Sequence, residues 1–196
     1  MNQENKNKKI AIVGHTKGIG KAIADLFKKK NYEVIGLSRT NGYDIVDNQE
    51  KIMEQISDCG FVVINAHSDR GQINLLKRIY GNHCFDPMKV AVITSTSGTE
   101  EGKDVKEFKS WDKFKYVQYC ETKKELIAYI TELQEELVNK PLSVYDVCPD
   151  LVDTDMIKGL WENAPKLKAT EVADAVRYCF ESTFNVNKIV IQKNAR

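Results

Sequence analysis

The chain lacks the features that mark several large classes of protein. Its five cysteines are odd in number, widely spaced and never arranged as CxxC, which argues against a disulfide framework or a structural zinc site. No apolar run approaches the roughly 18 residues of a membrane-spanning helix. The lysine-rich stretch 1–9 has no apolar centre, so we expect neither export nor a membrane anchor. A reducing cytoplasm is the simplest compartment for such a chain.

The sequence also lacks an excess of charge of either sign. Its 29 Lys and Arg balance 28 Asp and Glu, which argues against the strongly basic surface of a general nucleic-acid binder. Proline-rich linkers, low-complexity tracts and internal repeats are absent, and the histidines show no metal-ligand spacing. We therefore expect no metal site, a flexible N-terminus over residues 1–8, and a single domain over 9–196.

Short apolar runs typical of β-strands recur along the chain, at 10–13, 33–37, 61–65, 90–94, 142–147 and 188–192. Between several of them lie amphipathic helical patterns, at 49–57, 118–138 and 170–180, and 43–46 could add a short strand. This alternation predicts an α/β fold, with a doubly wound, mostly parallel Rossmann-type sheet covered by helices on both faces. Ligands of such sheets bind beyond the carboxyl ends of the strands.

A glycine-rich turn follows the first of these runs and leads into a helical pattern. Gly14 permits a tight turn, Gly18 lets backbone amides approach a pyrophosphate, and Gly20 lets the helix pack close to the strand. The free amides and the dipole at the start of a helix favour an anion. Glycine turns without a ligand share the pattern, but its place between strand and helix favours a dinucleotide site, which also includes Thr16, Lys17 and Ile19.

The end of the second run indicates which dinucleotide binds. The run ends in Ser38-Arg39 and lacks the carboxylate that an NAD site usually offers to the adenosine ribose. Arg39 can clamp a 2′-phosphate, Ser38 can donate a hydroxyl, and Lys17 adds charge. If the two basic residues contribute roughly 2–4 kcal/mol, NADPH is preferred by about 30- to 1000-fold. The alternative is ordinary surface charge; the sequence favours NADP(H).

Two further motifs carry polar groups suited to catalysis. Tyr119 and Lys123 are four residues apart at the start of a helical pattern, which places them on one helix face. A packing residue beside a lysine is the competing interpretation of that spacing. Ser95 follows another strand-like run and would deliver a hydroxyl to the same crevice.

Taken together, the motifs resemble those of the short-chain dehydrogenase/reductase family. They are GxxxGIG at 14–20, Asn65-Ala66 after a strand, Ser95 before Gly98, YxxxK at 119–123, and Pro149 with Thr154, in the family's order over nearly the whole chain. The resemblance implies that Tyr119 is the acid/base, that Lys123 assists it and holds the nicotinamide ribose, and that Ser95 positions the substrate oxygen. It makes Asn74 the fourth catalytic residue and adds to the cofactor site Asp44, Asn65, Ala66, Pro149 and Thr154. Local turn, strand-end and helix-cap roles remain the alternatives for Asp44, Asn65 and Thr154.

The implied function is NADP(H)-dependent interconversion of a carbonyl and an alcohol. The expected partner is a small-molecule substrate, with no nucleic acid and no membrane, and a homo-oligomer is left open. Hydride delivery leaves an alkoxide that needs a proton. An ammonium about 5 Å from the tyrosine, at an effective dielectric near 20, would lower its pKa by about two units. A catalytically silent NADP(H)-binding regulatory or redox-sensing protein is the alternative, and a family epimerase or dehydratase is a third.

The chain departs from the family's pattern in four places. His67 and Asp150 stand where glycine is usual. The segment 66–90 is short, which implies a trimmed helical layer. The segment 95–119 is long, with a solvated loop or a lid expected around Glu100, Glu101, Lys103 and Asp104. The apolar residues within 155–166, among them Trp161, are expected to cap the substrate side.

Overall fold

The structure is a computed structural model that describes residues 8–99 and 116–193. Within these ranges a six-stranded sheet has the order β2-β1-β3-β4-β5-β6, with every neighbouring pair parallel. The strands are β1 (Lys9–Val13), β2 (Glu33–Leu37), β3 (Phe61–Ile64), β4 (Lys89–Ile93), β5 (Ser143–Pro149) and β6 (Lys188–Ile191). The predicted α/β fold with a doubly wound, parallel sheet is confirmed.

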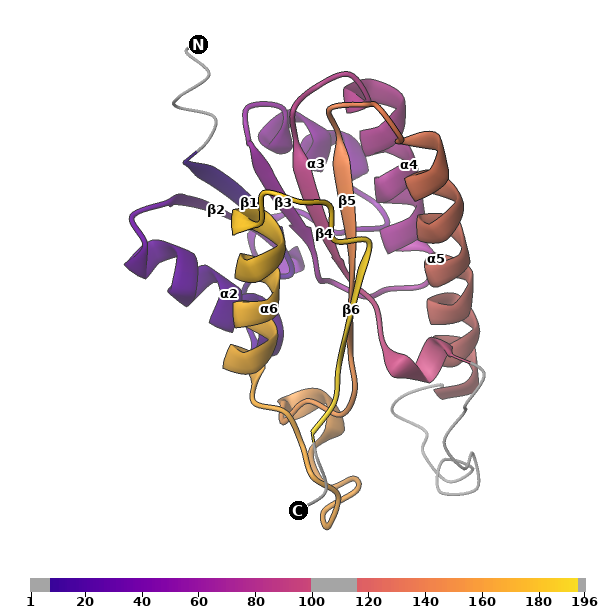
Figure 1. Ribbon diagram of the computed structural model, residues 1–196. Helices are drawn as coiled ribbons and strands as arrows, with labels where there is room; N and C mark the ends of the chain where they lie inside the picture. Colours follow the sequence, from indigo (N-terminus) through magenta and orange to yellow (C-terminus); the bar gives the residue numbers. More distant parts are fainter. Residues whose placement is uncertain (1–7, 100–115, 194–196) are drawn as a thin grey trace.

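Helices cover both faces of this sheet (Figure 1). One face carries α2 (Gly18–Lys29) and α6 (Ala169–Glu181), and the other carries α3 (Gln49–Ile56), α4 (Gly71–His83) and α5 (Tyr116–Glu136). Alternate strand residues point to opposite faces, so Ile10 and Ile12 join the core under α2 and α6 while Ala11 and Val13 join the other. Because both faces are buried, the strands appear in the sequence as continuous apolar runs.

One expectation about local structure is wrong. The residues 43–46 form no strand, and the chain turns at 45–47, because Asp44 Oδ1 accepts hydrogen bonds from the backbone amides of Val46 at 2.7 Å and Asp47 at 3.4 Å. The short segment between β3 and β4 carries one helix, α4, of 13 residues. Its buried face repeats Leu75, Leu76 and Ile79 at helical spacing.

Two predicted segments fall outside the described residues. They are the N-terminal stretch 1–8, except for Lys8, and the charged loop that contains Glu100, Glu101, Lys103 and Asp104.

The strand order creates a switch point beside β1. The chain runs from β1 outward to β2 and then returns to β3 on the other side of β1, so the connections diverge there. Asn65, just after β3, closes the gap by donating from Nδ2 to the carbonyl of Gly14 at 2.9 Å. Gly14 has φ +92° and donates its amide to Leu37 O at 2.7 Å, so the turn after β1 is tied to both neighbours.

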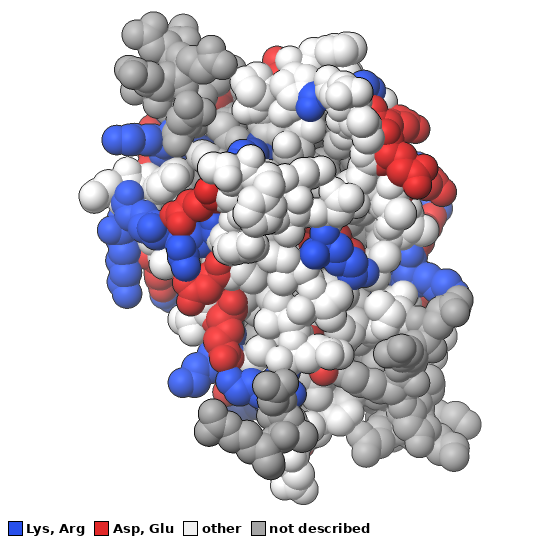
Figure 2. All heavy atoms as spheres, in the orientation of Figure 1, with Lys and Arg blue, Asp and Glu red and all other residues white. Residues whose placement is uncertain are grey.

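The two helices of one face, α2 and α6, are also joined at their surface. Lys30 and Glu181 form an ion pair at 3.0 Å, and Arg177 donates to Glu181 at 2.8 Å. Acidic and basic side chains are mixed on this side of the molecule (Figure 2). No helix within residues 8–99 and 116–193 has both the length and the apolar character needed to span a membrane.

Gly20 supplies a test of the loop geometry. A Cβ there would overlap the carbonyl oxygen of Gly14 and stand 2.7 Å from Asn65 Nδ2, whereas a Cβ at Gly81 in α4 meets nothing within 4 Å. We expect Gly20→Ala to lower the free energy of unfolding by about 1–3 kcal/mol or more, through overpacking. Gly81→Ala should raise it by about 0.5–1 kcal/mol, as alanine does inside helices. Urea denaturation measures both, and equal effects of the two substitutions would contradict the close approach.

Candidate active site

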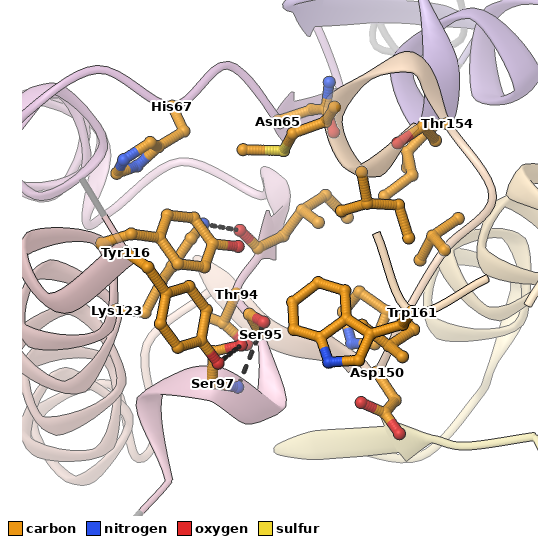
Figure 3. Close-up of a pocket in the computed structure, with 18 residues that line it drawn as sticks. Asn65, His67, Thr94, Ser95, Ser97, Tyr116, Lys123, Asp150, Thr154 and Trp161 are labelled. Atoms are coloured by element: carbon orange, nitrogen blue, oxygen red, sulfur yellow. Dashed lines mark hydrogen bonds between the residues drawn. The ribbon is translucent and has the colours of Figure 1, made fainter. Parts of the chain in front are cut away.

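A cavity of about 120 Å³ lies beyond the carboxyl ends of the central strands (Figure 3). Ser95, Tyr119 and Lys123 line it, although Ser95 and Lys123 come from segments far apart in the sequence. Its wall also contains four residues that were predicted to bind the cofactor, namely Ile19, Asn65, Pro149 and Thr154. The structure thus brings three of the four predicted catalytic residues to one cavity.

Lys123 forms the buried floor of this cavity. Its side chain comes from α5, the residue is 2% exposed, and Nζ donates to Gln72 Oε1 at 2.7 Å and to Ile93 O at 2.8 Å. Burial lowers the pKa of Lys123 from 10.5 to about 7, while the nearby Asp146 and Cys148 oppose this shift. The proton on Lys123 is therefore loosely held for a lysine.

Tyr119 stands one helical turn before Lys123 on α5. Its ring centroid lies 5.5 Å from Lys123 Nζ and 4.8 Å from the ring of His67, which it meets edge to face. Burial raises the pKa of Tyr119 to about 12, although a hydrogen bond with Ser95 lowers it. The raised pKa is opposite to the lowering expected from Lys123, because burial disfavours the charged phenolate. Tyr119 is therefore a protonated phenol at neutral pH.

Ser95 lies between β4 and the short helix η2 (Thr96–Gly98). Its hydroxyl oxygen accepts a hydrogen bond from the Ser97 amide at 3.2 Å, which fixes the start of η2. A Cβ on Gly98 would stand 2.6 Å from the Lys123 carbonyl carbon, so η2 rests directly on the backbone of α5. This close approach holds Ser95 beside Tyr119 and Lys123.

Asn74, which was predicted as the fourth catalytic residue, does not line this cavity. The side chain of Asn74 is exposed on α4, whereas Gln72, two residues earlier, is 1% exposed and reaches Lys123. The sequence contained a usable signal, because residues 72, 75, 76 and 79 share a helix face and position 74 falls on the other side. Gln72 is the polar member of that otherwise apolar face.

The glycine-rich loop leads into the N-terminus of α2 beside the cavity. Lys17 is the N-cap of α2 and makes no side-chain capping bond, and both Thr16 and Lys17 are exposed. Gly18 begins the helix at φ +51°, and a Cβ there would stand 3.1 Å from Thr154 Cγ2. The amides of this helix start, next to the turn at Gly14, fit a phosphate group.

Asn65 and Ala66 hold that loop from the β3 side. A Cβ on Gly14 would stand 2.6 Å from the Ala66 amide nitrogen, so the two backbones are in contact. Asn65 lines the cavity, and its side-chain amide donates to the carbonyl of Gly14. Asn65 therefore both holds the end of the strand and belongs to the site. The glycine-rich loop and the cavity are therefore adjacent, at the same edge of the sheet.

The residues expected to select the dinucleotide lie at the end of β2. The side chain of Arg39 is 80% exposed, and its Nε lies 3.9 Å from Asp44 Oδ2. Ser38 is buried, precedes the short helix η1 (Arg39–Asn41) as its N-cap residue, and donates from its hydroxyl to Asn41 Oδ1 at 2.9 Å. The Ser38 hydroxyl, which was expected to donate to the dinucleotide, thus already donates within the protein. Arg39 is the exposed side chain at the end of β2.

The remaining wall of the cavity is largely aromatic. Tyr116 and Trp161 lie 6.2 Å apart between ring centroids, and Asp150 lines the cavity with them (Figure 3). Asp150 accepts a hydrogen bond from Thr96 Oγ1 at 3.0 Å. Burial, and then the charge of Lys123, lower the pKa of His67 to about 4, although a hydrogen bond with Gln72 opposes this shift. The imidazole of His67, which stands where the family usually has glycine, is therefore neutral at physiological pH.

No protein-family model and no curated protein matches the chain by sequence. Solved structures nevertheless resemble it over nearly its whole length. A 3-ketoacyl-(acyl-carrier-protein) reductase from Brucella melitensis, complexed with NADH, has a TM-score of 0.77 at 15% identity and covers 95% of this chain and 97% of its own. A short-chain dehydrogenase from Burkholderia cenocepacia in complex with NADP has a TM-score of 0.74 at 13% identity, covering 96% and 90%.

A third similar structure is a short-chain dehydrogenase/reductase from Vibrio parahaemolyticus, with a TM-score of 0.72 at 19% identity. It covers 95% of this chain and 100% of its own. The chain therefore has the fold of the short-chain dehydrogenases/reductases.

The buried Lys123 predicts how stability depends on pH. The unfolded chain keeps this proton up to about pH 10.5 and the folded protein releases it near pH 7, so between these values the unfolded state binds more protons. The free energy of unfolding should therefore rise with pH in this window. We expect the increase from pH 7 to pH 9 to be about 2 kcal/mol larger in the wild type than in Lys123→Met. Urea denaturation at the two pH values measures it, and parallel pH dependence of the two proteins would contradict the depressed pKa.

Proposed function

We propose that the protein is an NADP(H)-dependent oxidoreductase of the short-chain dehydrogenase/reductase type, which interconverts a carbonyl and an alcohol. The observation that carries this proposal is the meeting of Ser95, Tyr119 and Lys123 at one cavity, next to a loop that fits a dinucleotide phosphate. The fold supports it, since chains of this fold carry NADH or NADP in the similar structures.

Each residue of the group has a distinct task in this chemistry. Bound reduced nicotinamide would supply the hydride. Ser95 donates a hydrogen bond that orients the substrate carbonyl oxygen, and Tyr119 gives its proton to the same oxygen as negative charge develops. A neutral phenol is the form needed for reduction, and the raised pKa of Tyr119 maintains that form. Lys123 then stabilises the tyrosinate that the transfer leaves.

The preference for NADP(H) rests on the charges at the outer end of the site. Arg39 is exposed where the adenosine ribose would lie, and Lys17 is exposed at the start of α2. The sequence Ser38-Arg39 also lacks the carboxylate that would bind a free ribose hydroxyl. Electrostatic attraction to a 2′-phosphate is therefore the favoured interaction.

Tyr119→Phe tests the catalytic assignment. The assay is NADPH oxidation against a panel of aldehydes, ketones and quinones. Removal of the hydroxyl should lower turnover by at least about 100-fold, because general-acid catalysis contributes that much, while NADPH binding is kept. Tyr129→Phe, a partly buried tyrosine further along α5, is the matched control and should retain turnover. Equal turnover of Tyr119→Phe and wild type would remove Tyr119 from the mechanism. NADPH binding without reduction of any compound would favour the silent binding protein.

Arg39→Ala tests the choice of cofactor. Loss of a charge-assisted interaction with the 2′-phosphate should weaken NADPH binding by about 10- to 100-fold and leave NADH binding unchanged. Arg78→Ala, an exposed arginine on α4, serves as the control. Fluorescence titration of both cofactors gives the dissociation constants. A parallel loss for NADH and NADPH, or none for either, would contradict the assignment of Arg39.

A further inference from the structure

Gln72 has its side-chain orientation fixed by the sheet. It is the second residue of α4 and 1% exposed, and its Nε2 donates to Ile64 O at 3.0 Å and to Ile93 O at 3.1 Å. These carbonyls belong to the last residues of β3 and β4. Because an amide nitrogen has two protons and both are used here, a flipped amide would place an oxygen against two carbonyl oxygens. The oxygen Oε1 must therefore face α5.

Lys123 Nζ meets this oxygen at 2.7 Å, and His67 also forms a hydrogen bond with Gln72. The other described acceptor of Nζ is Ile93 O at 2.8 Å, so both of these partners are uncharged carbonyls. Gln72 and Lys123 therefore converge on the same backbone carbonyl, and the amide braces the ammonium from the α4 side.

The charged and titratable groups described around Lys123 do not replace Gln72 as the direct acceptor of its ammonium. From β5 the facing groups are Asp146 and Cys148, and from the other side they are His67 and Tyr119. Asp146, the only carboxylate among these four, accepts from Thr94 Oγ1 at 2.5 Å and lies 3.1 Å from Lys188 Nζ. Its charge acts on Lys123 from a distance, whereas Gln72 contacts the ammonium directly.

We propose that Gln72 is the positioning residue of this site, which holds Lys123 Nζ at the end of β4 and stabilises its protonated form. Without the acceptor Oε1, a buried ammonium would lose one of its two described hydrogen bonds and could neutralise by releasing its proton. The significance for catalysis rests on the proposed function. The contact itself and its effect on protonation do not require turnover.

The test is a direct titration of Lys123 in the cofactor-free, full-length protein. The ¹³Cε and ¹Hε resonances of ¹³C-labelled lysine are followed from pH 5 to 11, and Lys123→Met assigns the signal. We expect the midpoint of Lys123 to fall by about one to two pH units in Gln72→Met, because a hydrogen bond to a charged group is lost. In Gln72→Glu it should rise, since a carboxylate replaces the neutral acceptor.

Gln49→Met is the matched control. Gln49 is also a buried glutamine whose Nε2 bonds two backbone carbonyls, Ile45 O at 2.7 Å and Gly71 O at 3.1 Å. Its loss should lower stability in a comparable way and leave the Lys123 midpoint in place. A purely structural role for Gln72 would give the same result for both glutamines.

An unchanged Lys123 midpoint in folded Gln72→Met would overturn the proposal. If that protein does not fold, Gln72→Glu decides by the same criterion, with Gln72→Asn, which shortens the reach to Nζ, as a further variant expected to lower the midpoint. These outcomes are separate from those of the catalytic assay. A shifted midpoint combined with no turnover on any compound would leave the bond between Gln72 and Lys123 established and would count against the oxidoreductase alone.

Discussion

The contact between the turn after β1 and the residues after β3 is the constraint on which the rest of the site depends. The carbonyl of Gly14 accepts from Asn65, and its amide donates to Leu37. At Gly20 there is no room for a side chain beside Gly14 and Asn65. This packing fixes the direction in which α2 leaves the sheet. It also places the amides of the α2 N-terminus and the cavity at the same edge, as the topology of an open parallel sheet requires.

The site built on this frame consists of polar groups that are costly to bury. A lysine and a tyrosine stand together with little access to water, which depresses the pKa of one and raises that of the other. Burial of an ammonium requires fixed acceptors, and Ile93 O at the end of β4 and Gln72 Oε1 supply them, while the last carbonyls of β3 and β4 hold the Gln72 amide in place. The stability of the fold and the protonation state of the site are therefore linked through the same few hydrogen bonds.

The sequence predicted most of the fold because strands buried on both faces produce unmistakable apolar runs. It predicted less well where side-chain placement depends on helix phase. Asn74, which is exposed, was assigned to the catalytic group, and the buried Gln72 was not considered. The helix that carries both was not anticipated, since its polar residues interrupt the apolar ones. Similarly, Ser38 was expected to face a ligand, but a contact with Asn41 three residues later uses its proton. Such local hydrogen bonds compete with ligand binding and leave no periodic signal.

The approach of Gly98 to the backbone of Lys123 has a consequence for how the chain can vary. Tyr116, at the start of α5, donates from its hydroxyl to Ser97 Oγ at 3.2 Å, so both ends of the segment between η2 and α5 are anchored close together. When the two ends of a loop are held in this way, the entropic cost of closure grows only slowly with loop length. Insertions and deletions between Thr99 and Tyr116 can therefore accumulate without displacing Ser95 from Lys123.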